Sequence, residues 1–334
     1  MDAGSESFPT SRTSDTADYV AHDALLTGLT PDAIYCYEVL DGDTVIASGL
    51  RVHAAWTTPH ALRILAFGDS GDGSTEQLAL RDEMLGHDFD VFLHLGDMAY
   101  DRGTFREFED NVFGVYDGFM HSVPAFPAIG NHEYLTSNGA PYLAMYYLFE
   151  QALRTADQER YYSFDYGDVH FIALDSNFQI LATVSDTATD DMLDWARADL
   201  AGTTAPWRIA FFHHPPYSSG EHGSDTGLWD TILPVLEEGG IDLVLVGHDH
   251  QYERSIPITG GAAAAAGDMA AITYVVAGAG GAGLRAAPGD WFTAYVNDSV
   301  HNFLLLEIDG CSAHGEAIDD AGFVLDSFDL DGCE

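Results

Sequence analysis

The chain has 334 residues, of which 46% are hydrophobic and 12% aromatic, so it can bury a large core and is not a disordered protein. Its 54 acidic and 12 basic residues give a formal charge of −42, and so negative a chain repels nucleic acid and anionic membranes. It has no run of eighteen apolar residues, so we expect no membrane span.

The charge is also unusual in kind, because every basic residue is an arginine. Salt would screen the mutual repulsion of the carboxylates, so adaptation to a saline habitat is one explanation of the composition. Drift in a GC-rich genome is an equally good alternative. A negatively charged substrate needs local positive charge to bind such a protein. Bound metal cations are the obvious source of that charge, since basic side chains are few.

The N-terminal part divides into two predicted segments. Residues 1–16 are polar, lack the apolar region of a signal peptide, and are expected to form a flexible lead-in. Residues 17–60 contain short strands and turns, with the sequence Gly-Leu-Thr-Pro ahead of an alternating strand at 34–40. This pattern resembles the later half of a fibronectin type III-like sandwich. The strands are too few for a complete sandwich, so we expect a partial fibronectin type III-like β module that serves as a packing platform.

From residue 61 to residue 334 the pattern predicts one α/β domain. Short apolar runs that suit buried strands alternate with amphipathic stretches that suit helices. Strands are expected at 63–67, 91–95, 125–129, 170–174, 207–212, 243–246 and 273–276, helices at 75–86 and 190–201, and β-hairpins through 303–308 and 323–330.

Five of these predicted strands end in a small cluster of Asp, Asn or His residues. The clusters are Gly68-Asp69, Gly96-Asp97, Gly130-Asn131-His132-Glu133, His213-His214 and Gly247-His248-Asp249-His250. Ligands bind beyond the carboxyl ends of strands in α/β sheets, so we expect the clusters to converge on one crevice. A glycine in four of them lets the backbone turn without a Cβ clash. The donors suit Fe, Zn or Mn, and the lack of clustered cysteines argues against a thiolate zinc site.

These clusters, together with Tyr100, resemble the five motifs of the calcineurin-like metallophosphoesterases from about residue 62 to the C-terminus. Most members of that family have a histidine two residues after the first aspartate, where this chain has Gly71. Tyr100, three residues after Asp97, supplies the missing ligand, and that exchange is typical of the purple acid phosphatase branch. The resemblance implies a β-sandwich flanked by helices, in the layer order αββα.

Carried over position by position, the resemblance implies two metal ions. The first would be held by Asp69, Asp97, Tyr100 and His250, and the second by Asp97, Asn131, His213 and His248. A phenolate with two carboxylates favours Fe(III), whereas two imidazoles, an amide and one shared carboxylate suit divalent Zn, Fe or Mn. Two ions about 3.5–4 Å apart clamp a phosphate and activate a hydroxide for in-line attack.

Two further histidines are predicted to act in catalysis. His132 is the candidate general acid, because imidazole titrates in the useful range. His222 occupies the position of a family histidine that contacts phosphate, although this chain has Gly223 where the family often has a second histidine. A Phe-His-x-Pro pattern favours His213 as the ligand, with His214 as the alternative. Glu133 is expected to orient His132 or a ligand and not to bind metal, and Asp249, which points away from the two flanking histidines, is expected to be structural.

Other features have plainer interpretations. His94 and His170 lie within predicted strands, where we expect core histidines, and Arg102 and Arg106 are expected at the surface. The glycine-rich stretch 277–283 lacks the Lys-Ser/Thr of a nucleotide-binding loop, and we expect it to allow close backbone packing near the site.

The predicted function is that of an acid phosphatase, which hydrolyses small-molecule phosphomonoesters by attack of a metal-activated hydroxide. The same metals would serve a phosphodiesterase or a nucleotide pyrophosphatase, and the sequence does not separate these. An alternative of another class is a non-catalytic binding protein that retained the fold. The presence of all seven predicted ligands argues against it, because a decayed site should have lost some.

Three cysteines are too few for a dense disulfide scaffold. Cys311 and Cys333 bracket the C-terminal strands and are candidates for pairing, whereas Cys36 is expected to stay free and buried. A disulfide would imply an oxidising compartment. We expect a secreted, periplasmic or extracellular protein whose targeting segment is not part of this chain.

Overall fold

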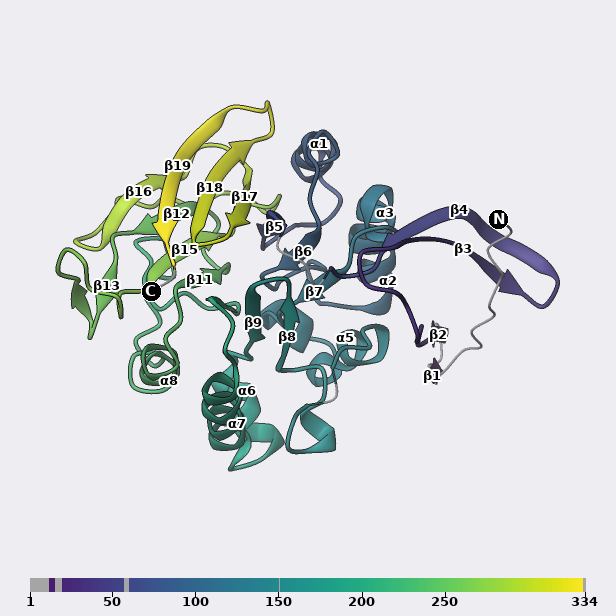
Figure 1. Cartoon of the computed structure of the whole chain (residues 1–334), viewed down its shortest axis with the longest axis horizontal. Coiled ribbons are helices and arrows are strands. Elements are labelled where there is room, and N and C mark those ends of the chain that lie inside the picture. The colour runs from purple at the N-terminus through teal and green to yellow at the C-terminus, as the bar shows by residue number, and fades with distance from the viewer. Residues whose placement is uncertain (1–11, 16–19, 57–59, 150, 333–334) are drawn as a thin grey trace.

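The computed structural model describes residues 12–15, 20–56, 60–149 and 151–332. Two large β-sheets pack against each other, and helices cover their outer faces (Figure 1). This is the predicted sandwich with the layer order αββα. No helix of the described ranges is both long enough and apolar enough to cross a membrane.

The first large sheet has six strands and carries three of the predicted clusters. Its central strands β5, β6 and β7 are parallel, and the three C-terminal strands extend it as antiparallel hairpins on the side of β5. In spatial order the strands are β19 (Val324–Asp331), β18 (Ser312–Asp319), β17 (Asn302–Asp309), β5 (Leu62–Phe67), β6 (Val91–His94) and β7 (Ala125–Pro127).

The second large sheet has seven strands and carries the other two clusters. Strands β9, β10, β11 and β15 are parallel, and the remaining three pair antiparallel. In spatial order the strands are β16 (Thr293–Asn297), β12 (Tyr252–Ser255), β15 (Thr273–Ala277), β11 (Leu243–Val246), β10 (Trp207–Phe211), β9 (Val169–Ala173) and β8 (Tyr162–Tyr166).

Strand β5 shows why both faces of each sheet are apolar. Its residues Ile64 and Ala66 point into the core between the two sheets, while Leu65 and Phe67 point into the core beneath the helices. Successive side chains of a strand point to opposite faces, so a strand covered on both sides must be apolar throughout. This is why these strands were visible in the sequence as mainly apolar runs.

Helices form the two outer layers. Those that cover the six-stranded sheet are α1 (Thr75–Met84), α2 (Phe105–Phe108), α3 (Gly114–Met120), α4 (Asn131–Tyr134) and α5 (Ala140–Met145), with a π-helical stretch, Glu109–Phe113, between α2 and α3. Those that cover the seven-stranded sheet are α6 (Phe178–Val184), α7 (Ala188–Gly202) and α8 (Ile232–Glu238). The predicted helices at 75–86 and 190–201 correspond to α1 and α7.

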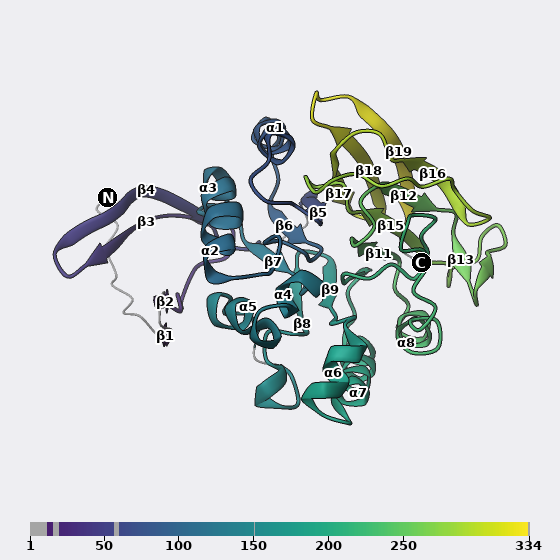
Figure 2. The same ribbon diagram turned by 180° about the vertical axis from the view of Figure 1, so that it is seen from behind.

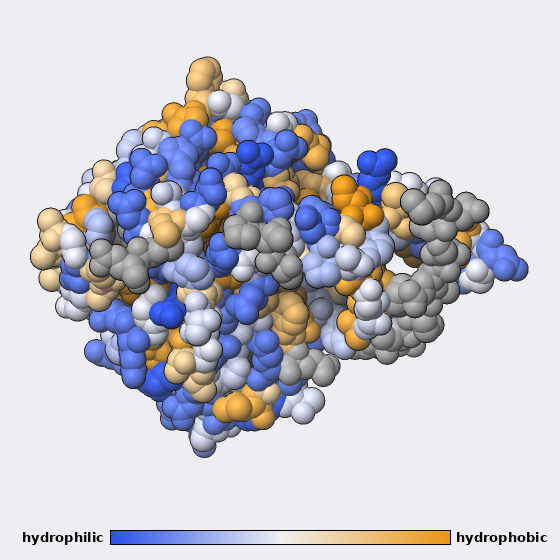
Figure 3. Space-filling model, in the orientation of Figure 1, coloured by the Kyte–Doolittle hydropathy of each residue, from blue (hydrophilic) through white to orange (hydrophobic). Residues whose placement is uncertain are grey.

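The N-terminal part is a two-stranded ribbon that projects away from the sandwich in both ribbon views (Figure 1, Figure 2). It consists of β3 (Ile34–Asp41) and β4 (Thr44–His53), and Trp56 just beyond it is buried edge-on against the ring of Tyr166. Two short pairs complete the strands: β1 (Arg12–Asp15) with β2 (Val20–Asp23), and β13 (Ile258–Thr259) with β14 (Ala262–Ala263). The space-filling view shows a largely hydrophilic face with scattered apolar residues (Figure 3).

The ribbon corrects one expectation about the cysteines. Cys36 is free as expected, but it is exposed and not buried, because none of the described residues forms a second layer over the β3–β4 ribbon at that point. The likeness to a fibronectin type III module stays a prediction, as do the boundaries at residues 16 and 60. Cys333, the predicted partner of Cys311, lies outside the described residues, as does most of the predicted lead-in.

Candidate metal centre

The five clusters meet where the carboxyl ends of the parallel strands in the two sheets come together. Backbone hydrogen bonds join neighbouring clusters within each sheet, from Asp69 N to Gly96 O (3.1 Å) and from Gly247 N to His213 O (3.0 Å). A third bond, from Gly68 N to Ala277 O (2.8 Å), joins the two sheets. The crevice therefore lies between two sheets, with three clusters supplied by one sheet and two by the other.

One group of side chains surrounds the hydroxyl of Tyr100. That oxygen lies 3.1 Å from Asp69 Oδ1, 3.3 Å from Asp97 Oδ2 and 3.1 Å from His250 Nε2. All four residues are buried. They are the four residues predicted to hold the first metal ion.

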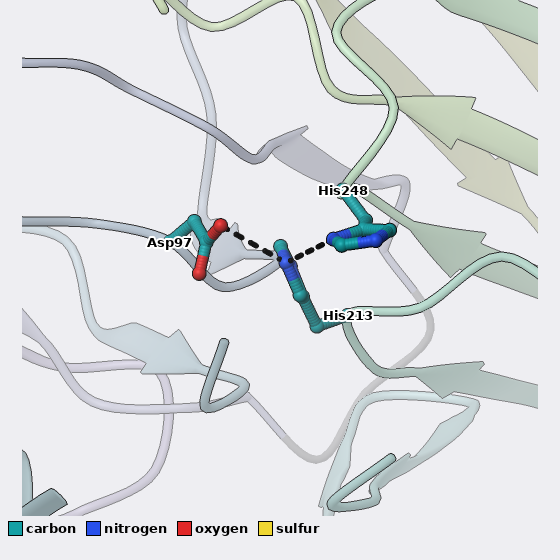
Figure 4. Close-up of side chains that lie close together, drawn as sticks. All are labelled: Asp97, His213 and His248. Carbon is teal, nitrogen blue, oxygen red and sulfur yellow. Dashed lines mark hydrogen bonds and ion pairs between the residues drawn. The ribbon is translucent and has the colours of Figure 1, made fainter. Parts of the chain in front are cut away.

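A second group surrounds the ring of His213. Its Nε2 lies 3.0 Å from Asn131 Oδ1, 3.2 Å from Asp97 Oδ2 and 3.2 Å from His248 Nδ1. Figure 4 shows Asp97 and His248 pointing toward His213 from opposite sides, and one potential ligand atom from each of these three residues lies within 4.8 Å of the others. These are the four residues predicted to hold the second ion, and Asp97 belongs to both groups.

Two of the histidines are oriented by backbone carbonyls. His213 Nδ1 lies 2.9 Å from Leu95 O, and His250 Nδ1 lies 2.8 Å from Gly283 O. A carbonyl can only accept, so each ring carries its proton on Nδ1 and turns the lone pair of Nε2 toward the centre. Histidines that bind metals are generally held in this way.

The backbone at the strand ends is shaped for close approach. Asp69, Asp97 and His248 have φ angles of 57°, 51° and 72°, a left-handed conformation that is uncommon for residues other than glycine. A Cβ atom on Gly96 would lie 2.6 Å from His213 Nδ1, and one on Gly130 would lie 2.2 Å from both the backbone nitrogen and Oδ1 of Asp97. These glycines therefore let the ligand-bearing segments touch.

Glu133 holds the loop of Asp97 in place. Its carboxylate accepts hydrogen bonds from the backbone nitrogens of Asp97 (2.9 Å), Met98 (2.9 Å), Ala99 (3.3 Å) and Gly130 (2.9 Å). The side chain is fully buried and makes these contacts away from the ligand atoms. This agrees with the expectation that Glu133 orients a ligand and does not itself bind metal.

The electrostatics of the centre fit cations. Burial, and then the carboxylates of Asp69 and Asp97, raise the pKa of Tyr100 well above its ordinary value, so this phenol can ionise only beside a compensating positive charge. Burial would lower the pKa of His213, but Asp97 raises it to about 10, because a positive charge at this place is strongly favoured. Two carboxylates, a phenol, an amide and three imidazoles thus form a donor set that suits two hard or borderline ions.

The two predicted catalytic histidines contact different residues of the centre, His132 the ring of Tyr100 and His222 the ring of His248. The ring centroid of His132 is 4.2 Å from that of Tyr100, and its Nε2 is 3.8 Å from Asp97 Oδ2. The ring of His222 stacks on His248 with centroids 4.4 Å apart. His214 Nδ1 lies 2.8 Å from Ser176 Oγ and the His214 ring centroid is 4.4 Å from that of His248, whereas His213 is the member of this pair that contacts Asp97 and Asn131.

The other residues considered in the sequence have structural surroundings. His94 is buried with Nε2 3.1 Å from Ser70 Oγ, and His170 lies between two carboxylates, as expected of core histidines. Arg106 is exposed and pairs with Asp110, while exposed Arg102 donates to a backbone carbonyl. Asp249 is buried and accepts hydrogen bonds from Ser218 Oγ and His222 N, which is a structural role.

The glycine-rich stretch packs against the first cluster. A Cβ atom on Gly280 would lie 2.3 Å from Gly68 O, so the close backbone approach expected from the sequence is present. Just beyond this stretch a cavity of about 600 Å³ opens beside the centre, and its walls include Tyr100, His132 and Arg285. Arg285 was not singled out from the sequence. Its one signal was its position two residues after the glycine-rich stretch in a chain with few basic residues.

Comparison with known proteins places the chain among phosphoesterases. Residues 62–252, which include every predicted site residue, match the calcineurin-like phosphoesterases. Acid phosphatase type 7 of Danio rerio is 30% identical over 273 residues, which cover 71% of this chain and 58% of that protein. Purple acid phosphatase 21 of Arabidopsis thaliana is 27% identical over 239 residues, which cover 68% of this chain and 52% of that protein. The chain thus spans little more than half the length of these relatives.

A solved structure shares the fold. The purple acid phosphatase from seeds of yellow lupin, Lupinus luteus, superposes with a TM-score of 0.76 at 22% identity, over 93% of this chain and 62% of that one. At such low identity the likeness concerns the fold.

Proposed function

This chain belongs to the calcineurin-like phosphoesterase family, and from that premise we propose that it is an acid phosphatase that hydrolyses small-molecule phosphomonoesters at a centre of two metal ions. The predicted family is confirmed, and purple acid phosphatases are among its relatives. The observation that carries the proposal is the position of the Tyr100 hydroxyl, within 3.3 Å of Asp69, Asp97 and His250. A tyrosine there distinguishes the purple branch that the sequence resembles.

The residues fit two different ions. Asp69, Asp97, Tyr100 and His250 would hold Fe(III), which hard anionic oxygen donors favour, and Asp97, Asn131, His213 and His248 would hold divalent Zn, Fe or Mn. When bound, such a pair neutralises phosphate charge and supplies the nucleophile by lowering the pKa of a water molecule. The buried carboxylate of Asp97 would keep the two ions together.

His132 is proposed as the acid for the leaving group. Its Nδ1 lies 2.6 Å from Asp101 O, so that nitrogen carries a proton and the ring is fixed over Tyr100. Nε2 is then the atom that exchanges a proton with the departing alkoxide, and imidazole does this readily near neutral pH. His222 is proposed to assist at the phosphate through Arg285, whose guanidinium it contacts.

Export is a further part of the proposal. Cys311 is disulfide-bonded, and disulfides persist in oxidising compartments. A secreted, periplasmic or extracellular location would agree with that bond.

The proposal is tested by metal analysis combined with spectroscopy and kinetics. Protein loaded with Fe(III) and one divalent ion should contain two metals and show a visible tyrosinate-to-iron band, and Tyr100→Phe should abolish the band. Tyr166→Phe, at a buried tyrosine that packs against Trp56 away from the centre, should retain it. An active enzyme without iron would contradict the purple branch.

The reaction type is tested with a monoester and a diester of one chromogenic alcohol. The monoester should react faster, and Asn131→Ala or His213→Ala should lower its rate by a factor of about 10² or more, because each removes a predicted ligand. A faster diester would identify a phosphodiesterase instead. No hydrolysis by the two-metal protein, or unchanged rates in both variants, would contradict catalysis at this centre.

A further inference from the structure

Arg285 borders the cavity beside the metal centre and is the one arginine among the described residues that line it. The same walls carry three carboxylates, from Asp72, Glu76 and Asp101. The whole chain carries a formal charge of −42, and among the cavity walls that the structure describes Arg285 is the only permanently positive side chain that an entering anion meets.

The guanidinium of Arg285 has no acidic partner. Its Nη1 donates to His222 Nε2 and lies 3.4 Å from His248 O, and within the described ranges no carboxylate oxygen comes within 4.0 Å of it. Several other arginines pair with acidic side chains, for example Arg63 with Glu307 and Arg254 with Asp326. The charge of Arg285 is therefore available to a ligand.

The loop that carries Arg285 is tied to the metal-ligand segment. Arg285 N donates to His250 O (3.2 Å), and His250 Nδ1 lies 2.8 Å from Gly283 O. These two bonds fix the start of the arginine side chain relative to the ring of His250. The ring of His222, against which the guanidinium lies, in turn stacks on His248.

We propose that Arg285 binds the phosphoryl group of the substrate and that His222 positions its guanidinium, an inference that rests on the proposed phosphatase function. A guanidinium can donate two parallel hydrogen bonds to two phosphate oxygens, which suits a tetrahedral dianion. Because His222 Nε2 accepts from Arg285, that nitrogen has no proton to give to phosphate. The phosphate contact expected of His222 then passes to Arg285, and His132 faces the same cavity.

The test compares variants of the two-metal enzyme on a chromogenic phosphomonoester. Arg285→Gln should raise both KM and the inhibition constant of inorganic phosphate about ten- to a hundredfold, the worth of a hydrogen bond to a charged group, while kcat changes less. Arg285→Lys keeps the charge but loses the two parallel donors of the guanidinium. Its KM and its inhibition constant for phosphate should lie between those of the parent and of Arg285→Gln. Metal content should be unchanged in both variants.

The positioning role of His222 is tested by two substitutions, of which only one keeps a hydrogen-bond acceptor. His222→Gln keeps an acceptor for the guanidinium and should raise KM less than His222→Ala does. The control is Arg106→Gln, which removes the same charge from a side chain that is 81% exposed, and it should leave KM and phosphate inhibition unaltered.

Several results would overturn the inference. One is an Arg285→Gln enzyme whose KM and phosphate inhibition stay within about twofold of the parent values while His222→Ala raises them, since His222 would then contact phosphate itself. Loss of metal from Arg285→Gln would also overturn the inference, because it would show that Arg285 has a structural role at the centre. If the parent protein hydrolyses no ester, the proposed function fails, and calorimetric binding of inorganic phosphate to the metal-loaded parent and Arg285→Gln proteins still decides the role of Arg285.

Discussion

At the scale of single residues, Asp97 connects the two halves of the centre. Its Oδ2 lies 3.3 Å from the Tyr100 hydroxyl and 3.2 Å from His213 Nε2, while its Oδ1 accepts from His132 N (2.8 Å). Burial would raise the pKa of Asp97, but His213 and then His132 hold it well below the ordinary value. The carboxylate is therefore favoured in its ionised form at the point where the two groups of side chains meet.

His170 gives a prediction about pH and stability. Burial would lower its pKa, but Asp199 at 2.8 Å and Asp165 at 2.7 Å raise it above 6.5. Because the folded pKa exceeds the unfolded one, the charged ring stabilises the fold fully below pH 6.5, and this contribution is lost as the pH rises through the folded pKa. We expect His170→Gln to lose about 1–2 kcal/mol at acidic pH and progressively less at alkaline pH.

Urea unfolding of the parent protein and of His170→Gln from pH 5.5 to pH 9 measures the difference in their free energies of unfolding. His314→Gln is the control, because His314 also pairs with an aspartate but lies at the surface, where solvent screening makes such a pair worth little. A deficit of His170→Gln that is constant with pH, or that grows at alkaline pH, would contradict the assignment.

At the scale of elements, the centre depends on how closely the strand ends approach one another. The segment after β7 touches the segment after β6 at Gly130, and the segment after β11 reaches Asp69 through a 2.7 Å hydrogen bond from His248 N to Asp69 Oδ2. The sandwich packs two sheets so that five such ends share one crevice.

Gly130→Ala tests this close approach. Its Cβ would lie 2.2 Å from Asp97 N and Oδ1, so the loop of Asp97 must shift. We expect loss of at least one metal and a fall in kcat/KM by a factor of about 10² or more, because about 1 Å of misplacement at a reacting centre has that effect. Gly202→Ala, where a Cβ meets nothing within 4 Å, should keep both metals and full activity. Full metal content and activity in Gly130→Ala would show that the loop has room to move.

The elements differ in how visible they were in the sequence. The strands β5, β6, β10 and β11 are largely buried on both faces, so each appeared as a mainly apolar run, interrupted in β5 by Arg63 and in β10 by Arg208. The edge strand β16 was missed because it is only half-buried, and its place is decided by pairing with β12.

At the scale of the whole molecule, the charge of −42 predicts a strong response to salt. Raising NaCl from 0.1 to 1 M shortens the screening length from about 10 Å to about 3 Å, which weakens the repulsion among carboxylates in the folded protein. We expect the melting temperature at pH 7 to rise by several degrees, measured by calorimetry at constant metal loading. Near the pI of about 4.2 the same salt series should have little effect. An unchanged or lower melting temperature at pH 7 would contradict the prediction.

The sequence by itself determined the α/β class and the residues that the structure brings together at the centre, while the αββα layering was implied by the family resemblance. Strand periodicity is a local property, and the short motifs at 69, 97–100, 131–132, 213 and 248–250 each lie at the end of one strand, so both were visible without long-range information. The family resemblance then related motifs that are far apart in the chain.

Only the tertiary structure decided how these residues meet. It placed Glu133 on the backbone nitrogens of another loop, and it set His213 Nε2 3.0 Å from Asn131 Oδ1, a contact that the Phe-His-x-Pro pattern favouring His213 does not contain. It also brought Arg285 against His222, which lies 63 residues earlier in the chain. Such contacts depend on the packing of two sheets and on loops with no period of their own, so no local pattern of residues contains them.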